Sequence, residues 1–344
     1  MVLLIGAGLD SQLQLPFEEL RAVAVEAERL GFESLWTPAG TVPDAFHVCS
    51  AWTRDTGLRT GTSVVPAARM WAPHSLAVQA ATVGLLSGGN FVLGIGSGGY
   101  GPAFWESLRT RNAPIAVMRE YVDVLHRLLR GETVTFDGAL FRLQDAMLNT
   151  SFDIPRVPVY IATLGDGMFR LAGECADGAL LNWATPERRD EARELIAEGA
   201  ARSGRDASDV PMSMYVRVCV DEDIEAARRA FGAQVIMYAL GRPGVSNTLG
   251  YRGQFARMGF DEALTELEAR RDAGAGTPEL VDAAPDELLQ ALGYYGDAAG
   301  AAEAYARASE GLDETVVRII SARPGPEAVV ATLEALTPEK IRAA

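Results

Sequence analysis

Residues 157–183 read VPVYIATLGDGMFRLAGECADGALLNW, and this stretch contains the repeating unit of the fold. The run 157–163 is mostly apolar, which predicts a buried strand. Residues 166–175 follow a glycine-containing turn and predict a helix, and the run 177–183 predicts a second buried strand. A strand, a helix and a strand in direct succession indicate one unit of a parallel α/β fold.

The same alternation continues on both sides of this stretch. Helical patterns separate the strands, and some begin at a proline or a capping aspartate, as at Pro73 and Asp44. Eight strands that are each followed by a helix are typical of a (β/α)8 TIM barrel. Two open, doubly wound domains would instead need a polar linker near the middle of the chain, and the sequence has none, so we expect one barrel domain over 1–344. The other six strands are predicted at 2–8, 33–37, 58–65, 91–96, 212–220 and 315–320.

Two segments interrupt the alternation. Residues 133–143 consist of two β-rich runs joined by Asp137-Gly138, which predicts a hairpin. Residues 230–292 are mostly helical in pattern and longer than one crossover requires. We expect this second segment to be an insertion at the exit of the seventh strand, over the catalytic face of the barrel.

Composition excludes several classes of protein. The chain has 46 acidic against 31 basic residues and a net charge of −15, which argues against nucleic-acid binding. Its three cysteines form no CxxC pair, so neither a disulfide framework nor a metal site is expected. The N-terminal residues do not resemble a signal peptide, and no apolar run is long enough to span a membrane. We therefore expect a cytoplasmic protein with a small-molecule substrate.

The predicted strand ends carry glycine and small polar residues rather than acid–base groups. We find no Ser/His/Asp order and no carboxylate pair there, so catalytic residues stay unassigned and a cofactor is expected to supply the chemistry. His47 and His126 fit structural positions, whereas His74 is retained as a candidate substrate contact. The pattern Gly94-x-Gly96-x-x-Gly99 does not fit a dinucleotide site, because the next predicted helix begins only near Pro114.

The turn Gly165-Asp166-Gly167 leads from a strand directly into a helix. Unpaired backbone N–H groups and the positive end of the helix dipole favour a phosphate at such a turn. An ordinary tight turn between a strand and a helix remains the alternative.

Several segments together resemble the luciferase-like monooxygenase superfamily, and within it the F420-dependent oxidoreductases. The resemblance covers nearly the whole chain and implies a (β/α)8 barrel with insertions, a deazaflavin cofactor (coenzyme F420) and a homodimer. The segments that carry it are AVAVEAERLGFESLWT, GTSVV with the following APHSLAVQAATVGLLSGGNFVLGIGSG, MREYVDVLHRLLRGETVTFDGALFRL, VPVYIATLGDGMFRLAGECADGALLNW and VVRIISARPG.

The resemblance also implies roles for individual residues. Ser63-Val64 matches a bulge whose non-proline cis peptide supports the cofactor ring, and Gly165 to Gly167 match the turn that holds the cofactor phosphate. Together with the other strand ends, the predicted cofactor-binding set is Gly8, Thr37, Ser63, Val64, Gly96, Ser97, Gly98, Thr163, Leu164, Gly165, Asp166, Gly167 and Asn182. The candidate substrate contacts are His74, Trp183, Tyr251, Arg252 and Arg257, and the last three also fit a solvated helix face.

The chain departs from the relatives that oxidise sugar phosphates and secondary alcohols. Those carry an Asp-His pair after the second strand and in some cases a Glu after the fourth, where this chain has Ala39-Gly40 and Gly99. Hydride transfer to an activated C=C, a C=N or a methylene-pterin-like group therefore fits better than alcohol oxidation. The alternatives are a monooxygenase that uses reduced FMN and oxygen, and a non-catalytic flavin- or deazaflavin-binding protein.

Overall fold

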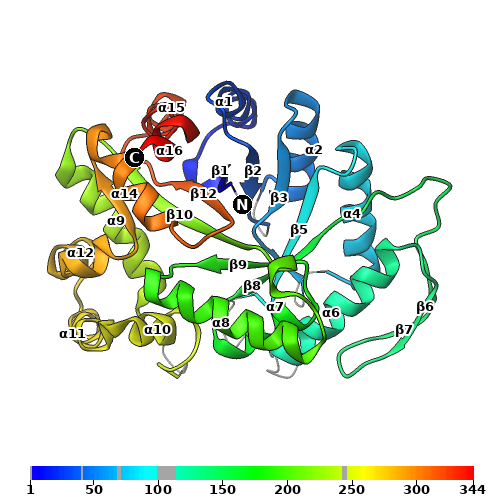
Figure 1. Ribbon diagram of the computed structural model, residues 1–344. Helices are drawn as coiled ribbons and strands as arrows, with labels where there is room; N and C mark the ends of the chain where they lie inside the picture. The colour runs from blue at the N-terminus through cyan, green and yellow to red at the C-terminus, as the bar shows by residue number, and fades with distance from the viewer. Residues whose placement is uncertain (1, 40–41, 68–70, 99–113, 242–245) are drawn as a thin grey trace. The chain divides into compact units, whose positions relative to one another are not determined.

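The computed structural model describes all residues except 1, 40–41, 68–70, 99–113 and 242–245 (Figure 1). Gly40 and Gly99 lie outside the described residues. In the described part of the chain, eight parallel strands follow one another with helices between them, and the fold class is the predicted (β/α)8 TIM barrel. These strands are β1 (Leu4–Gly8), β2 (Ser34–Thr37), β3 (Arg59–Thr62), β5 (Phe91–Gly96), β8 (Val159–Thr163), β9 (Gly178–Asn182), β10 (Met212–Val220) and β12 (Glu314–Ile319).

The chain divides into two compact units, of which one comprises residues 33–181 and 192–213. In this unit β2, β3, β5, β8 and β9 pair in that order, and β2–β3, β3–β5, β5–β8 and β8–β9 are parallel. Asp44 accepts hydrogen bonds from the first turn of its helix and caps it as predicted. The described helices of this unit are α2 (Ala45–Asp55), α4 (Pro73–Leu86), α6 (Pro114–Leu129), α7 (Asp166–Cys175), the larger part of α8 (Pro186–Arg202) and the 3-10 turn η2 (Ala207–Asp209).

The predicted third strand, 58–65, is interrupted. β3 ends at Thr62, and Val65–Pro66 form the short strand β4, which pairs with β5. The predicted hairpin is present as the antiparallel pair β6 (Val134–Asp137) and β7 (Arg142–Ala146). It extends outward next to α6 in Figure 1.

The other unit comprises residues 1–32, 182–191 and 214–344. Its strands pair in the order β11 (Gly293–Gly296), β10, β12 and β1, and β11 is a strand that the sequence did not predict. The described residues of the segment predicted as a helical insertion are mostly helical, but the first helix begins earlier than 230, at Ile224. Its helices are α9 (Ile224–Ala239), α10 (Gly250–Phe255), α11 (Asp261–Asp272), α12 (Thr277–Ala283) and α13 (Asp286–Gln290), with the π-helical turn η3 (Ala256–Phe260).

The inserted helices share a core with Trp183, the residue that follows β9 and belongs to the same unit. Phe231 of α9, Phe255 of α10 and Leu267 of α11 are buried in one apolar cluster with Trp183. The insertion is therefore packed as part of its unit rather than attached as a loop. The remaining helices of this unit are the 3-10 turn η1 (Ser11–Leu13), α1 (Phe17–Arg29), α14 (Ala298–Ser309), α15 (Pro326–Ala335) and α16 (Pro338–Ala343). Across the described residues, no helix combines the length and apolarity that crossing a membrane requires.

Candidate functional site

The strand ends of the first unit are joined by backbone hydrogen bonds. Ser63 N–H donates to the carbonyl of Thr37, the last residue of β2, at 2.9 Å. Ala39 N–H donates to the carbonyl of Val64 at 3.3 Å. The peptide bond between Ser63 and Val64 is cis, as the resemblance implied. The predicted residues Thr37, Ser63 and Val64 therefore lie together.

Gly96, the last residue of β5, lies next to Val64 of this group. A Cβ atom on Gly96 would lie 2.9 Å from Cγ2 of Val64 and 3.2 Å from Cβ of Ala162, so glycine lets these neighbours approach closely. Thr163, at the end of β8, is buried and donates through Oγ1 to the carbonyl of Leu180. Ser97 and Gly98 follow β5 directly, and Leu164 follows β8. The structure thus brings several predicted cofactor residues together at the strand ends of this unit.

The predicted phosphate turn opens helix α7. Gly165 is its N-cap, and among the described residues no side chain caps this helix. Of the residues that the structure describes, none would lie within 4 Å of a Cβ atom on Gly165, whereas a Cβ on Gly167 would lie 2.5 Å from Cδ1 of Ile115. A helix start without a side-chain cap suits an anionic group, because the first backbone N–H groups of a helix and its dipole attract negative charge.

Two other predicted residues each have a close neighbour in their own unit. In the second unit, a Cβ atom on Gly8 would lie 3.2 Å from Cε1 of Tyr215 and 3.3 Å from Cγ1 of Val316. In the first unit, Nε2 of His74 lies 2.9 Å from the carbonyl oxygen of Met147. The His74 ring thus already contacts the segment that follows the hairpin, and its role toward a substrate stays a prediction.

Asn182, the last residue of β9, is the centre of a polar cluster in the second unit. Its Oδ1 accepts a hydrogen bond from Nη1 of Arg217 on β10 at 2.5 Å, and its Nδ2 donates to the hydroxyl of Tyr251 on α10 at 2.7 Å. The Arg217 guanidinium lies 3.8 Å from the centroid of the Trp183 ring and 5.2 Å from that of Tyr238. We call these five residues the Asn182 cluster.

Trp183 has an unusual backbone. Its φ angle is 53°, in the left-handed region that bulky residues rarely adopt. The residue is 1% exposed, and its indole N–H has no hydrogen-bond partner among the residues that the structure describes. Its carbonyl accepts from Nε2 of Gln254 at 3.3 Å. Such backbone conformations are often found at ligand sites, where surrounding contacts maintain them.

Burial controls the electrostatics of this cluster. Arg217 is 4% exposed, and burial lowers the pKa of its guanidinium while the nearby Tyr238 and Tyr251 hydroxyls act to raise it. Burial also raises the pKa of Tyr251, and Tyr238 raises it further, although the Asn182 hydrogen bond and the Arg217 charge act in the opposite direction. Tyr251 is therefore protonated at neutral pH. Among the described residues Arg217 has no carboxylate partner, so the Asn182 amide and the Trp183 and Tyr238 rings stabilise its positive charge.

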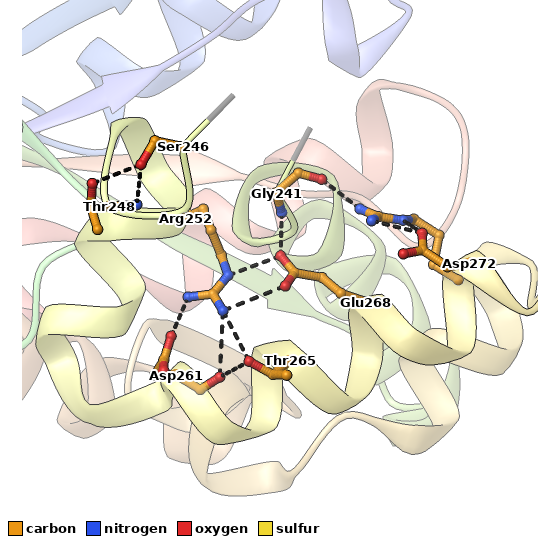
Figure 2. Close-up of polar contacts among 9 residues, drawn as sticks. Gly241, Ser246, Thr248, Arg252, Asp261, Thr265, Glu268 and Asp272 are labelled. Atoms are coloured by element: carbon orange, nitrogen blue, oxygen red, sulfur yellow. Dashed lines mark hydrogen bonds and ion pairs between the residues drawn. The ribbon is translucent and has the colours of Figure 1, made fainter. Parts of the chain in front are cut away.

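Arg252 takes part in a different network, which Figure 2 shows. Its guanidinium donates from Nε to Oε1 of Glu268 at 2.9 Å and from Nη1 to Oδ1 of Asp261 at 2.7 Å. The same Glu268 oxygen accepts the backbone N–H of Gly241 at 2.6 Å. Arg252 is buried, and we propose for it a structural role that joins α10 to α11. Arg257 is exposed, donates to the carbonyl of Thr248 at 3.4 Å, and stays a candidate substrate contact.

A model of the luciferase-like monooxygenase family matches residues 1–315 of the chain. The chain belongs to this family.

Proteins of similar sequence include named reductases and dehydrogenases. The chain is 27% identical over 300 residues to a 5,10-methylenetetrahydromethanopterin reductase of Archaeoglobus fulgidus, covering 83% of this chain and 88% of that protein. It is 30% identical over 301 residues to an F420-dependent glucose-6-phosphate dehydrogenase of Nakamurella multipartita, covering 81% of this chain and 83% of that protein.

The fold is also that of a solved structure, the coenzyme F420-dependent tetrahydromethanopterin reductase of Methanopyrus kandleri. The TM-score is 0.79, with 98% of this chain and 99% of the other covered. Sequence identity is 20%, so this likeness supports the barrel fold and nothing finer.

Sequence reasoning about this luciferase-like family member missed Arg217 and Tyr238. The signal for Arg217 was available, because it is the charged residue inside the otherwise mostly apolar strand MSMYVRVCV. A buried charge is costly unless it is paired or hydrogen-bonded, so it marks a position that needs an explanation. Tyr238 had no comparable signal, since its contact with Arg217 depends on how α9 packs.

Proposed function

We propose that this luciferase-like family member is an F420-dependent oxidoreductase that transfers a hydride to a small organic substrate. The observation that carries the proposal is that similar proteins covering more than four-fifths of this chain are named as a methylenetetrahydromethanopterin reductase and as an F420-dependent dehydrogenase. The acceptor that we favour is an activated C=C, a C=N or a methylene-pterin-like group.

The residues of the first unit fit a deazaflavin with a phosphate. Gly165, Asp166 and Gly167 would hold the phosphate, because among the described residues no side chain caps α7 and no atom would lie within 4 Å of a Cβ on Gly165. Ser63, Val64 and Gly96, with their neighbours at the strand ends, would contact the ring. When bound, a deazaflavin supplies a hydride, and the chain's own task is to orient the reacting groups and exclude water.

The favoured direction is reduction, because the chain shows no built-in base at the position where alcohol-oxidising relatives are expected to have one. The segment that follows β2 reads Thr37-Pro38-Ala39, and none of these side chains is an acid or a base at neutral pH. A reduction needs a proton donor rather than a base.

A binding experiment separates the candidate functions. Purified protein is titrated with F420 and, separately, with FMN, following the fluorescence of each cofactor. We expect saturable binding of F420 and oxidation of reduced F420 when an activated C=C or C=N compound is added. Binding of FMN alone would favour the monooxygenase. Binding of F420 without turnover of any acceptor would favour a non-catalytic binding protein.

We also propose that the protein is a cytoplasmic homodimer that pairs through the helices following the second to fourth strands. In support, α4 exposes three large apolar side chains: Val78 at 42%, Leu85 at 38% and Leu86 at 59%. Apolar side chains that gather on the exposed face of one helix are typical of an interaction surface.

A further inference from the structure

The chain between β3 and β4, in the first unit, contains an extra residue opposite β5. β3 pairs with β5 as far as Gly61 and Val92, and β4 resumes the pairing at Val65 and Ile95. Between these two pairs, three residues on the side of β3 and β4 lie opposite two residues of β5. An extra residue of this kind forms a β-bulge, which bends its strand and redirects the side chains at the bend.

The side chain of Thr62 links this bulge to β5. Its Oγ1 accepts the backbone N–H of Gly94 at 2.9 Å and donates to the carbonyl oxygen of Gly94 at 3.0 Å. In a regular parallel pair, a backbone carbonyl of the neighbouring strand would accept that N–H. Thr62 is fully buried, so removing its hydroxyl would leave a buried N–H group without this acceptor, which is costly.

The two glycines of the pattern Gly94-x-Gly96 make room for the bulge. A Cβ atom on Gly94 would overlap the carbonyl oxygen of Thr62, and one on Gly96 would lie 2.9 Å from Cγ2 of Val64. The chain can therefore pass over Gly94 at Thr62 only because Gly94 has no side chain. The pattern, which does not fit a dinucleotide site, thus has a physical explanation in the shape of this strand end.

The bulge brings two residues toward the surface in an otherwise buried segment. Ser63 and Val64 are partly exposed, whereas Thr62 before them and Val65 after them are buried. The backbone of both partly exposed residues is hydrogen-bonded to the end of β2 and the segment that follows it. These are also the two residues proposed to contact the cofactor ring, so the position of that contact depends on how the bulge is fixed.

We propose that Thr62 is a positioning residue for the cofactor ring: its hydroxyl, bonded to Gly94, fixes the bulge so that Ser63 and Val64 lie against the ring. This inference rests on the proposed function and adds to it a residue that acts through its neighbours. The ligand is a planar deazaflavin, whose ring must be held in one orientation to transfer a hydride. The role belongs to the hydroxyl of Thr62 and not to its methyl group.

Three substitutions that change the hydrogen-bonding atom test this role. Thr62→Ser keeps the hydroxyl, Thr62→Cys replaces it with a thiol, which is a weaker donor and acceptor, and Thr62→Val removes it at nearly constant volume. F420 is titrated into each purified variant and its fluorescence is followed. We expect the Kd for F420 to rise roughly tenfold or more in Thr62→Val and by a smaller factor in Thr62→Cys. Thr62→Ser should keep the Kd within about twofold of the wild type.

Thr315→Val is the matched control. Thr315 is an equally buried threonine on β12, in the other unit, and its Oγ1 lies 2.9 Å from the Tyr305 hydroxyl and accepts a hydrogen bond from Ser309 at 3.0 Å. This variant also loses buried hydrogen bonds, so it should unfold at a lower urea concentration but bind F420 with the Kd of the wild type. The comparison separates a loss of stability from a loss of ring position.

The outcomes separate this inference from the proposed function. A wild type that does not bind F420 contradicts the proposed function, and this inference with it. If the wild type binds F420, the positioning role is overturned when Thr62→Val is folded by circular dichroism and binds equally well, or when Thr315→Val raises the Kd as much. Should Thr62→Val fail to fold, equal Kd values for Thr62→Cys and Thr62→Ser overturn the role.

A second measurement uses the protein without cofactor. The methyl groups of valine are labelled with ¹³C, and the Val64 signals are assigned by their absence in Val64→Ile. Thr62→Cys is expected to shift the Val64 signals, because Val64 lies against Gly96 only while the bulge is fixed, and Thr62→Ser should leave them near their wild-type positions. Val64 signals that do not move in Thr62→Cys would show that the hydroxyl does not position Val64, and would overturn the inference.

Discussion

Asp177 holds the start of β8 through three neighbours in the same unit. Its Oδ2 accepts the backbone N–H of Val159 at 2.8 Å and lies 2.8 Å from Nε2 of His126, and its Oδ1 accepts from Arg156 at 2.9 Å. Burial alone would raise the pKa of this carboxyl, but the His126 contact, Val159 and Arg156 together lower it to about 2.

This depressed pKa predicts how stability depends on pH. The carboxylate stabilises the fold fully above its unfolded pKa and loses this effect as the pH falls toward 2. Asp177→Asn should therefore lower the free energy of unfolding by about 2 kcal/mol at pH 7, and roughly half of that difference should be gone at pH 3. Urea unfolding of both proteins from pH 7 to pH 3 measures it. A difference that stays constant over this range would contradict the assignment.

The phosphate turn predicts a loss of binding without a loss of fold. At Gly165 the backbone is extended, with φ −104° and ψ 160°, and a Cβ would have no neighbour within 4 Å in the described part of the chain. Gly165→Val should fold normally but fill the space beside the helix start, raising the dissociation constant for F420 roughly tenfold or more. Fluorescence titration measures the constant, and urea unfolding checks the fold.

Gly276→Val is the control for that variant. Gly276 is also an N-cap glycine, at the start of α12, and a Cβ atom there would have Pro278 as its nearest neighbour, at an ordinary 3.7 Å. An unchanged F420 constant in Gly165→Val would show that the phosphate lies elsewhere. Gly167 is less suited to this test, because its side chain would first meet Ile115.

At the scale of elements, the sequence predicted most helices and strands because their apolar spacing is regular. The helix 166–175 and the strand 212–220 both have the bounds that the sequence predicted. β11 was missed because GYYG is short and contains two glycines, which weaken a strand signal. The predicted strand 58–65 was wrong at its end, because β3 stops at Thr62 and β4 begins at Val65, and the β-branched residues on both sides of Ser63 do not indicate a break.

The Arg252 network predicts that α10 and α11 depend on one buried ion pair. The side chains of Arg252 and Glu268 are 4% and 12% exposed, so removing the cation leaves a buried carboxylate without its partner. Arg252→Met should lower the free energy of unfolding by roughly 3 kcal/mol, and the double variant Arg252→Met with Glu268→Met should recover part of that loss. Urea unfolding of both variants tests this. Equal stability of the single and double variants would mean that Glu268 does not need the cation.

At the scale of the whole molecule, the alternation of strands and helices was enough to predict the barrel, and residues 1–315 match the family model. We propose that the two units form the single domain expected from the sequence. The Asn182 cluster was beyond sequence reasoning as a group, because it joins residues 182, 217 and 251, whose contacts depend on packing of the inserted helices.

A charge introduced on the exposed face of α4 tests the proposed dimer interface. Leu86→Arg on α4 places a charge among apolar side chains and should shift the protein from dimer to the 36.7 kDa monomer in sedimentation equilibrium at micromolar concentration. Met237→Arg, at a comparably exposed apolar position on α9, should leave the dimer intact. A wild type that sediments as a monomer would rule out the homodimer.

The F420-dependent oxidoreductase and the FMN-dependent monooxygenase differ in whether their reaction requires oxygen. A 5-deazaflavin has carbon where FMN has nitrogen at ring position five, so it moves a hydride in one step, whereas a flavin monooxygenase places an oxygen atom from O2 in its product. If the chain uses F420, its residues need only orient the acceptor, exclude water and provide a proton, and oxygen has no part in the reaction. We therefore expect reduced F420 to support equal turnover with and without oxygen, with no ¹⁸O in the product when the reaction runs under ¹⁸O2. Activity that disappears under strict anaerobiosis, or ¹⁸O in the product, would assign the chain to the monooxygenases instead.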